Sequence, residues 1–221
     1  MGQWHNFLVG CSGVVAHNSY YDDFVKYIDN YAGSSLSSVQ RSRLKEVFKD
    51  HDFLLSEWKA ANNQIAQTLL VDKMAKIVDG PWYALHKEAN SLFAAEVQSL
   101  KGLYPKAKIG YRGSLSRGQK FIGEDPITKE AIFGDFNPNS FDMDGFIVSD
   151  ALAAKFPADI PWRNARKLKS EPIFESTADK LHLEFSKKLS GYRKDDIFTF
   201  RVWTEAEFQS KVVKDGYKLI K

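Results

Sequence analysis

The stretch from Tyr111 to Asp150 constrains the fold more than any other part of the chain. It opens as an apolar strand that runs into the small-residue turn Gly113-Ser114, and it closes with an expected strand over Phe141 to Val148. Asp142 and Asp144 stand on alternate positions at the start of that second strand. Because residues i and i+2 of a strand point to the same side, we expect two carboxylates side by side above an apolar core.

This arrangement suits phosphate chemistry. Two carboxylates a few ångströms apart are hard oxygen ligands of the kind that Mg²⁺ or Mn²⁺ accepts. The Gly113-Ser114 turn offers backbone N–H groups to a phosphate, with no bulky side chain in the way. The plainer alternative is a hairpin with Asp142 and Asp144 at its rim, without any chemical role.

The whole chain sets looser bounds. It has 221 residues, 43% of them hydrophobic, which is enough for one good-sized core or two small domains. The net charge of +3 says little about nucleic acid binding. The single cysteine, Cys11, excludes an intramolecular disulfide, and no apolar run is long enough to predict a membrane span.

The first 18 residues carry no Lys, Arg, Asp or Glu and end in His17-Asn18. An asparagine side chain can attack its own carbonyl and cut the chain after itself, and a preceding histidine can assist the proton transfers. With His5-Asn6-Phe7 and Val15-Ala16-His17-Asn18, this stretch resembles the end of the intein-like Hint (pretoxin) domains of bacterial polymorphic toxins. An ordinary β-hairpin leader is the alternative.

The resemblance implies a division of the chain and a setting. Residues 1–18 would be the remnant of a processing junction, and His17 and Asn18 its reactive pair. The rest would be a toxin domain of the contact-dependent inhibition or Rhs type, secreted as the C-terminal part of a larger protein and active in the cytoplasm of a rival cell. A cognate immunity protein is then expected as a partner.

Residues 19–103 are expected to be a helical region. Apolar residues at helical spacing predict four helices. Ser35 is expected to cap the second, and Ile65 and Leu69 are among the expected core positions of the third. The expected helices cover Tyr20 to Tyr31, the segment after Ser35, Leu54 to Val78, and Trp82 to Leu100.

Residues 104–221 alternate between strand and helix patterns. The fold class that follows is α+β, with an N-terminal helical bundle and then a small mixed-sheet domain. In this second half we expect a strand at Lys108 to Tyr111, the start of a helix at Leu115 to Phe121, a loop or small hairpin at Gly123 to Ser140, and a strand at Ile197 to Trp203.

A strand ending in Gly-Ser, an Arg-Gly shortly after it and then an Asp-x-Asp strand resemble the signature of the nucleotidyltransferase superfamily that includes DNA polymerase beta. The likeness covers about 40 residues and implies a nucleotidyltransferase-like catalytic region over 104–221. A nucleoside triphosphate would be the substrate, with Mg²⁺ as the cofactor. Carried over, Asp142 and Asp144 would be catalytic metal ligands, and the substrate-binding residues would be Arg112, Gly113, Ser114, Arg117 and Lys120.

Two departures from the superfamily pattern stand out. The gap between Ser114 and Asp142 is long, so residues 123–140 must be an insert. The third acid of the superfamily, which lies on a later strand, is not evident either. The acids nearest the expected strand over Ile197 to Trp203 are Asp195, Asp196 and Glu205, outside its two ends.

Three functions therefore stay open. The first is transfer of a nucleotide, or a related phosphate group as in an alarmone-type pyrophosphokinase, onto an RNA such as a tRNA, a protein or a small nucleotide. The second is a Mg²⁺-dependent nuclease that uses the same acids. The third is a non-enzymatic binding module. The basic segment Trp162 to Lys169 could face nucleic acid, but a solvated basic face is the favoured alternative.

Overall fold

The computed structural model describes residues 18–31, 36–61, 63–129, 131–157, 159–160, 162–213 and 216–220. It confirms the α+β class, because helices fill the N-terminal part and a mixed sheet follows. The chain divides into two compact units, Met1–Lys76 and Ile77–Lys221. Of the expected processing pair, His17 lies outside the described residues and Asn18 is the first residue of a helix.

The first unit is helical. An aromatic cluster holds it together: the rings of Phe24 and Phe48 stack with centroids 4.0 Å apart, and Trp58 meets Phe24 edge-on at 5.4 Å. All three side chains are buried. The helices of this unit are α1 (Asn18–Asp29), α2 (Ser38–Asp50), α3 (Asp52–Ala60) and most of α4 (Gln64–Asp79).

The expected single helix over Leu54 to Val78 is wrong. Helix α3 ends at Ala60, and α4 starts anew after Asn63, whose side chain accepts a hydrogen bond from the Ala66 N–H and so caps the new helix. The break changes which side of α4 is buried. Ile65 and Leu69 are 74% and 64% exposed, contrary to expectation.

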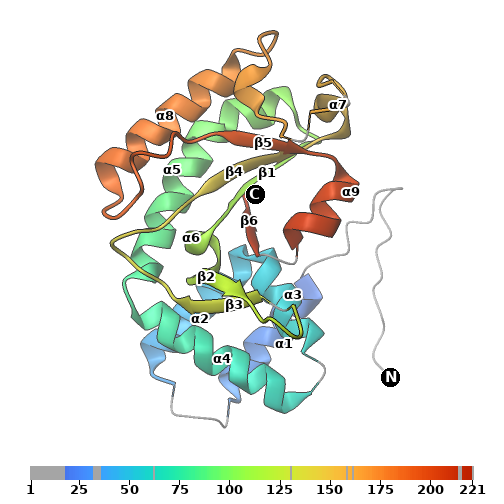
Figure 1. The fold of residues 1–221 in the computed structure, drawn as a ribbon. Helices are drawn as coiled ribbons and strands as arrows, with labels where there is room; N and C mark the ends of the chain where they lie inside the picture. The colour runs from blue at the N-terminus through green and yellow to red at the C-terminus, as the bar shows by residue number, and fades with distance from the viewer. Residues whose placement is uncertain are drawn as a thin grey trace. The chain divides into compact units, whose positions relative to one another are not determined.

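The second unit is built around a four-stranded sheet with the order β5-β4-β1-β6 (Figure 1). Strand β1 pairs antiparallel with β4 and β6, and β4 pairs parallel with β5. The strands are β1 (Lys108–Arg112), β4 (Asp144–Val148), β5 (Phe200–Trp203) and β6 (Tyr217–Leu219). The helical segments of the unit are α5 (Trp82–Leu103), α6 (Ser114–Arg117), α7 (Asp150–Ala153), η1 (Ala165–Lys167), α8 (Ile173–Lys188), α9 (Glu205–Glu207) and η2 (Phe208–Val212).

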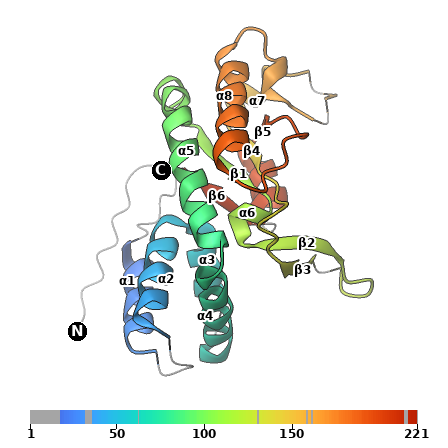
Figure 2. The ribbon, with the colours of Figure 1, turned by 90° about the vertical axis from the view of Figure 1, so that its left-hand side faces the viewer.

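Helices α5 and α8 lie side by side and pack with the sheet (Figure 2). Phe93 of α5 contacts Tyr111 of β1 and Phe200 of β5, with ring centroids 5.5 and 6.0 Å apart. This burial explains why α5, the last helix of the expected helical region, belongs to the compact unit of the sheet. The opposite face is covered by Phe208 and Val212 of η2, packed on Phe146 of β4.

A separate two-stranded hairpin joins β1 to β4. Strand β2 (Gln119–Glu124) pairs antiparallel with β3 (Ala131–Asp135), which places the insert as the small hairpin that the sequence allowed. The expected helix over Leu115 to Phe121 is wrong beyond its first turn. Gly118 ends α6 in the left-handed conformation, and the residues after it pair with β3 instead.

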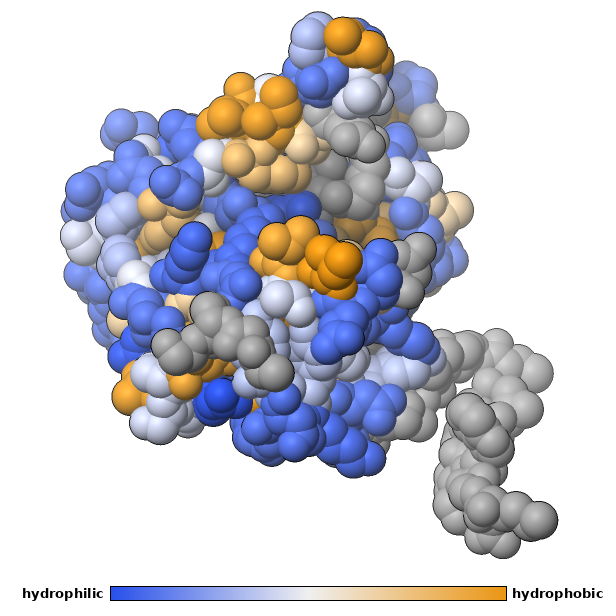
Figure 3. Space-filling view, turned by 90° about the horizontal axis from the view of Figure 1, so that it is seen from below, coloured by the Kyte–Doolittle hydropathy of each residue, from blue (hydrophilic) through white to orange (hydrophobic). Residues whose placement is uncertain are grey.

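The surface carries scattered apolar side chains. On the face drawn in Figure 3 they form small separate patches among hydrophilic residues. Single exposed apolar residues such as Val39 and Leu183 are common on proteins and do not by themselves indicate a binding site. Among the helices that the structure describes, none combines the length and the apolar character that a bilayer span needs.

Candidate active site

The turn after β1 is shaped by Gly113. Its φ of +106° belongs to the region that only glycine enters at little cost. A Cβ built on Gly113 would lie 2.8 Å from the backbone oxygen of Asp142, so the position also lacks room for a side chain. The glycine therefore allows the segment before β4 to approach the end of β1.

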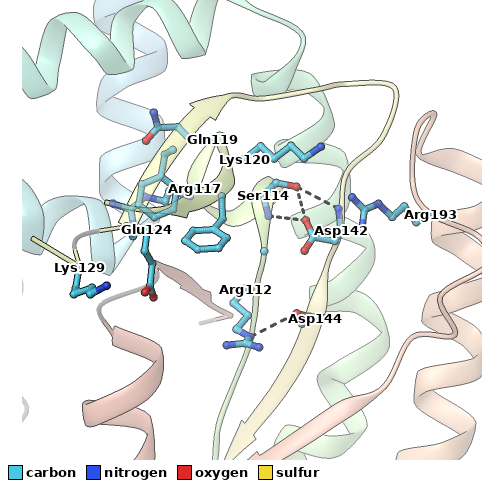
Figure 4. Close-up of a pocket in the computed structure, with 14 residues that line it drawn as sticks. Arg112, Ser114, Arg117, Gln119, Lys120, Glu124, Lys129, Asp142, Asp144 and Arg193 are labelled. Atoms are coloured by element: carbon cyan, nitrogen blue, oxygen red, sulfur yellow. Dashed lines mark hydrogen bonds and ion pairs between the residues drawn. The ribbon is translucent and has the colours of Figure 1, made fainter. Parts of the chain in front are cut away.

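Ser114 and Asp142 hold each other through three hydrogen bonds (Figure 4). Oδ1 of Asp142 accepts from the Ser114 N–H at 3.0 Å and from the Ser114 hydroxyl at 2.5 Å. The Asp142 N–H donates to Ser114 Oγ at 3.2 Å. The sequence predicted that Ser114 would face a phosphate; in this arrangement both of its polar groups position Asp142.

Asp142 and Asp144 come together, but by a different route from the one expected. Strand β4 begins only at Asp144, and Asp142 precedes it. Asp142 is placed by Ser114, while Asp144 lies opposite Arg112 in the β1–β4 register and forms an ion pair with it, Nε to Oδ2 3.6 Å. The expected start of the strand at Phe141 is wrong, because Phe141 forms only an isolated bridge to Tyr192.

The surroundings of the Asp144 carboxyl group disfavour its charged form. Loss of hydration raises its pKa above the usual range, and the negative charges of Asp142 and Asp196 raise it further. The positive charges of Arg112 and Arg193 act in the opposite direction. The side chain is nevertheless 56% exposed, so a ligand or an ion in solution can reach the carboxylate.

These residues line a cavity of about 680 Å³ between the sheet and the hairpin. We call its two sides the sheet wall and the hairpin wall; Figure 4 shows their charged residues facing the same space. The sheet wall consists of Arg112, Gly113, Ser114, Asp142, Asp144 and Arg193. The hairpin wall consists of Gln119, Lys120, Phe121, Glu124, Lys129, Ala131 and Phe133, with Arg117 of α6 beside it.

All seven residues predicted to act in catalysis or substrate binding line this one cavity. Three charged residues of the cavity were missed by the sequence reading: Glu124 and Lys129 of the hairpin, and Arg193 from the loop before β5. The hairpin charges lie in the segment read as an insert. Arg193 is distant in sequence, and its loop reaches the site through Tyr192, which bridges Phe141, and through the Arg193 N–H, which donates to the Phe141 carbonyl at 3.4 Å.

A buried polar network supports the sheet wall from α5. The His86 ring stacks on Trp82, and its Nδ1 lies 3.2 Å from the hydroxyl of Tyr111 in β1. That hydroxyl donates to Asn90 Oδ1 at 2.6 Å, and the Trp82 indole donates to the Leu115 carbonyl at 2.7 Å. Helix α5 thus fixes both the strand before the Gly113 turn and the helix after it.

The network keeps His86 neutral. Burial and, to a smaller extent, the positive charge of Lys218 lower its pKa to about 3, although a hydrogen bond with the Leu115 backbone acts in the opposite direction. The Asn90 amide lies 2.9 Å from His86 Nε2. The contacts of His86 with Trp82, Asn90 and Tyr111 give it a structural role.

The later acids differ in where they lie. Asp195 and Asp196 line a hollow of about 540 Å³ that also borders Asp142 and Asp144. Glu205 instead pairs with Lys108 at 2.6 Å, at the end of β1 opposite Arg112. Asp196 is therefore the later acid whose charge reaches Asp144, although it precedes β5 rather than lying on it.

The basic segment Trp162 to Lys169 is largely engaged in the fold. Arg163 forms an ion pair with Glu207 at 2.6 Å. Arg166 donates twice to the Phe198 carbonyl, at 3.0 and 3.2 Å, and pairs with Asp179. Neither arginine lines the cavity. Their contacts favour a structural role over a nucleic acid surface.

The donor set of the cavity fits a hard divalent cation in part. Within the described ranges, no group of three or more His, Cys, Asp or Glu side chains is arranged to hold a metal. Asp142 and Asp144 would contribute two carboxylates, and Mg²⁺ commonly takes its other ligands from water and from substrate phosphates. A cation there would also relieve the repulsion that raises the pKa of Asp144.

Similarity to known proteins gives no further guide to this site. No protein-family model, curated protein or solved structure matches the chain.

Proposed function

We propose that the protein is a toxin domain that transfers a nucleotidyl, or a related phosphate, group from a nucleoside triphosphate to an acceptor in a rival cell. One observation carries the proposal. A single cavity combines the Asp142–Asp144 pair with five cationic side chains, which are those of Arg112, Arg117, Lys120, Lys129 and Arg193. Two carboxylates suit a catalytic cation, and the cations suit the four negative charges of a triphosphate.

The reaction would run as an in-line displacement. The acceptor oxygen forms a bond to the α-phosphorus, the bond from that phosphorus to the α–β bridging oxygen breaks, and pyrophosphate leaves with the electron pair. The acceptor proton passes to a carboxylate of the pair, which acts as the general base. Bound Mg²⁺ would supply charge neutralisation at the attacking and leaving oxygens. Arg193 and Lys120, which line the same cavity, would stabilise the departing phosphates.

The toxin setting rests on the resemblance of residues 1–18 to a Hint junction, and that segment lies almost wholly outside the described residues. A cognate immunity protein and an RNA acceptor such as tRNA belong to the same expectation. Secretion as part of a larger chain and action in the target cytoplasm are proposed on that ground alone.

The test uses purified protein, Mg²⁺ and a cell extract with each nucleoside triphosphate, labelled in turn at the α- and the γ-phosphate. Transfer of the α-label to RNA, protein or a small nucleotide indicates nucleotidyl transfer, and transfer of the γ-label indicates the phosphate variants. Asp142→Asn should lower transfer by about 10²- to 10³-fold, as expected when one preorganised electrostatic group is lost. Asparagine keeps an oxygen that can accept from Ser114, so the fold should persist.

Asp135→Asn is the matched control, since Asp135 is exposed on β3 and does not line the cavity. It should transfer label at the wild-type rate. Absence of label transfer, together with toxicity that survives Asp142→Asn, would contradict the proposal. Degraded RNA or DNA without triphosphate turnover would instead identify the nuclease that the same acids could serve.

A further inference from the structure

The cavity extends well beyond the groups that a triphosphate and its cation would need. Its hairpin wall contains two phenylalanines, Phe121 and Phe133, as well as the small side chain of Ala131. None of these apolar side chains can stabilise a phosphate. The hairpin wall is thus chemically distinct from the sheet wall, although both face the same space (Figure 4).

The two phenylalanines are not equivalent. They are direct cross-strand partners, and their rings meet at 6.0 Å with an interplanar angle of 69°. Phe133 is half-buried, and the Arg117 guanidinium lies 3.9 Å from the centre of its ring. Phe121 is 55% exposed although it lines the cavity. Phe133 therefore supports the hairpin, and Phe121 presents aromatic surface to whatever enters.

A β-bulge follows Phe121 in strand β2. The β2–β3 register shifts between Phe121 and Gly123, so Ile122 is the extra residue of β2. Bulges redirect side chains and are frequent beside active sites. Ile122 lies close to Gly134 of β3 and does not line the cavity, whereas Phe121 before it does. The two neighbouring apolar residues thus differ in whether they can meet a ligand.

Polar groups frame the aromatic surface. The amide of Gln119 can both donate and accept hydrogen bonds, and the carboxylate of Glu124 can accept them. A flat aromatic ring bordered by hydrogen-bonding groups suits a nucleobase, whose faces stack and whose edges carry donors and acceptors. An inorganic polyphosphate would leave all of these groups without a contact.

We propose that the β2–β3 hairpin is a nucleobase platform on which the base of the substrate stacks against Phe121 while the triphosphate extends to the sheet wall. The proposal rests on the proposed function and deepens it, because it assigns recognition of the nucleobase to the hairpin and excludes inorganic polyphosphate as a substrate. It also gives the insert between Ser114 and Asp142 a task in substrate selection.

Calorimetric titration of the full chain tests the platform without turnover. The probes are α,β-methylene analogues of the four nucleoside triphosphates, and inorganic tripolyphosphate, each with Mg²⁺. Phe121→Ala should weaken binding of the best nucleotide by about 5- to 150-fold, the range found when one base-stacking aromatic is removed. The affinity of Phe121→Ala for tripolyphosphate should equal that of the wild-type protein. Phe121→Trp should retain nucleotide binding, since tryptophan also offers a stacking face.

Ile122→Ala is the matched control and should change neither affinity. Circular dichroism of each variant checks that the hairpin substitutions leave the fold intact. Equal nucleotide affinity in wild type and Phe121→Ala, or tripolyphosphate binding as tight as nucleotide binding, would overturn the platform and leave the proposed function standing. Absence of binding of every probe to the wild-type protein would overturn the proposed function, and the platform with it.

Discussion

In the sheet wall, Ser114 and Asp142 hold each other through three hydrogen bonds and Arg112 pairs with Asp144, whereas in the hairpin wall Phe121 is more than half exposed. The sheet wall also rests on α5 through a buried polar network. The hairpin is a separate two-stranded sheet. The contrast suggests that one wall fixes the reacting groups, while the other adapts to a substrate.

Substitution of two glycines tests this contrast most directly. Both have a positive φ; Gly113 belongs to the sheet wall, and Gly123 lies in strand β2 of the hairpin. Gly113→Ala should destabilise the protein by about 3 kcal/mol, since the strained φ is combined with a Cβ 2.8 Å from the Asp142 backbone. Gly123→Ala should cost only about 1–2 kcal/mol, because a Cβ there meets no atom within 4 Å. Urea unfolding of both variants gives the comparison.

Transfer activity should separate the same two variants. Gly113→Ala should lose it, since Asp142 must move to make room, while Gly123→Ala should retain it. If the two substitutions lower the free energy of unfolding equally, the sheet wall is no more constrained than the hairpin, and the contrast drawn from the contacts is wrong.

The second test uses low pH to protonate His86 and so disrupt the buried network that supports the sheet wall. The folded pKa of His86, about 3, is below its unfolded value of about 6.5, so the unfolded chain binds the proton more readily. Stability from this group is complete above pH 6.5 and is lost as the pH falls toward 3. Between pH 6.5 and 5 the loss should be about 2 kcal/mol, at roughly 1.4 kcal/mol for each unit.

His86→Gln provides the comparison for this loss. It should be less stable than wild type at pH 7, because the contacts with Tyr111 and Asn90 change. Its stability should nevertheless fall less between pH 6.5 and 5, since glutamine does not titrate. Urea unfolding at both values measures the difference, and an equal fall in the two proteins would assign the acid sensitivity to other groups.

Local sequence signals predicted much of the fold. The helix α5 follows from the apolar spacing after Pro81, and β1 from the short apolar run before the Gly113 turn. The break before α4 was missed although Asn63 is a good cap, because the apolar positions on both sides of it fit one continuous helix pattern. The start of β2 was missed because Gln119 to Phe121 were assigned to a helix that in fact ends at Gly118.

The sequence predicted which residues line the site better than it predicted how they are arranged. Asp142 and Asp144 were identified from their spacing, yet they do not share a strand, since Asp142 is placed by Ser114 from 28 residues earlier. No local pattern encodes that hydrogen bond. Arg193 was not predicted for a similar reason, because its loop joins the cavity through the bridge between Tyr192 and the distant Phe141.

The smallest expected effect concerns Asp144, because the charged carboxylate that the proposed cation site requires lowers the stability of the folded protein. Its folded pKa is raised, so the folded protein keeps the proton to a higher pH than the unfolded chain does. Stability from this group is present below the unfolded value near 3.8 and falls as the pH rises through the folded pKa. At pH 7, Asp144→Asn should therefore be slightly more stable than wild type, by less than about 1 kcal/mol because solvent screens the exposed side chain.

Magnesium should reverse that order if the carboxylate serves a cation. Thermal unfolding at pH 7 should show a Tm that rises with Mg²⁺ for wild type, as binding to the folded state requires, and a smaller rise for Asp144→Asn. Asp135→Asn, on the outer strand of the hairpin, should respond to Mg²⁺ as wild type does. An equal rise in all three proteins would remove Asp144 from the cation site.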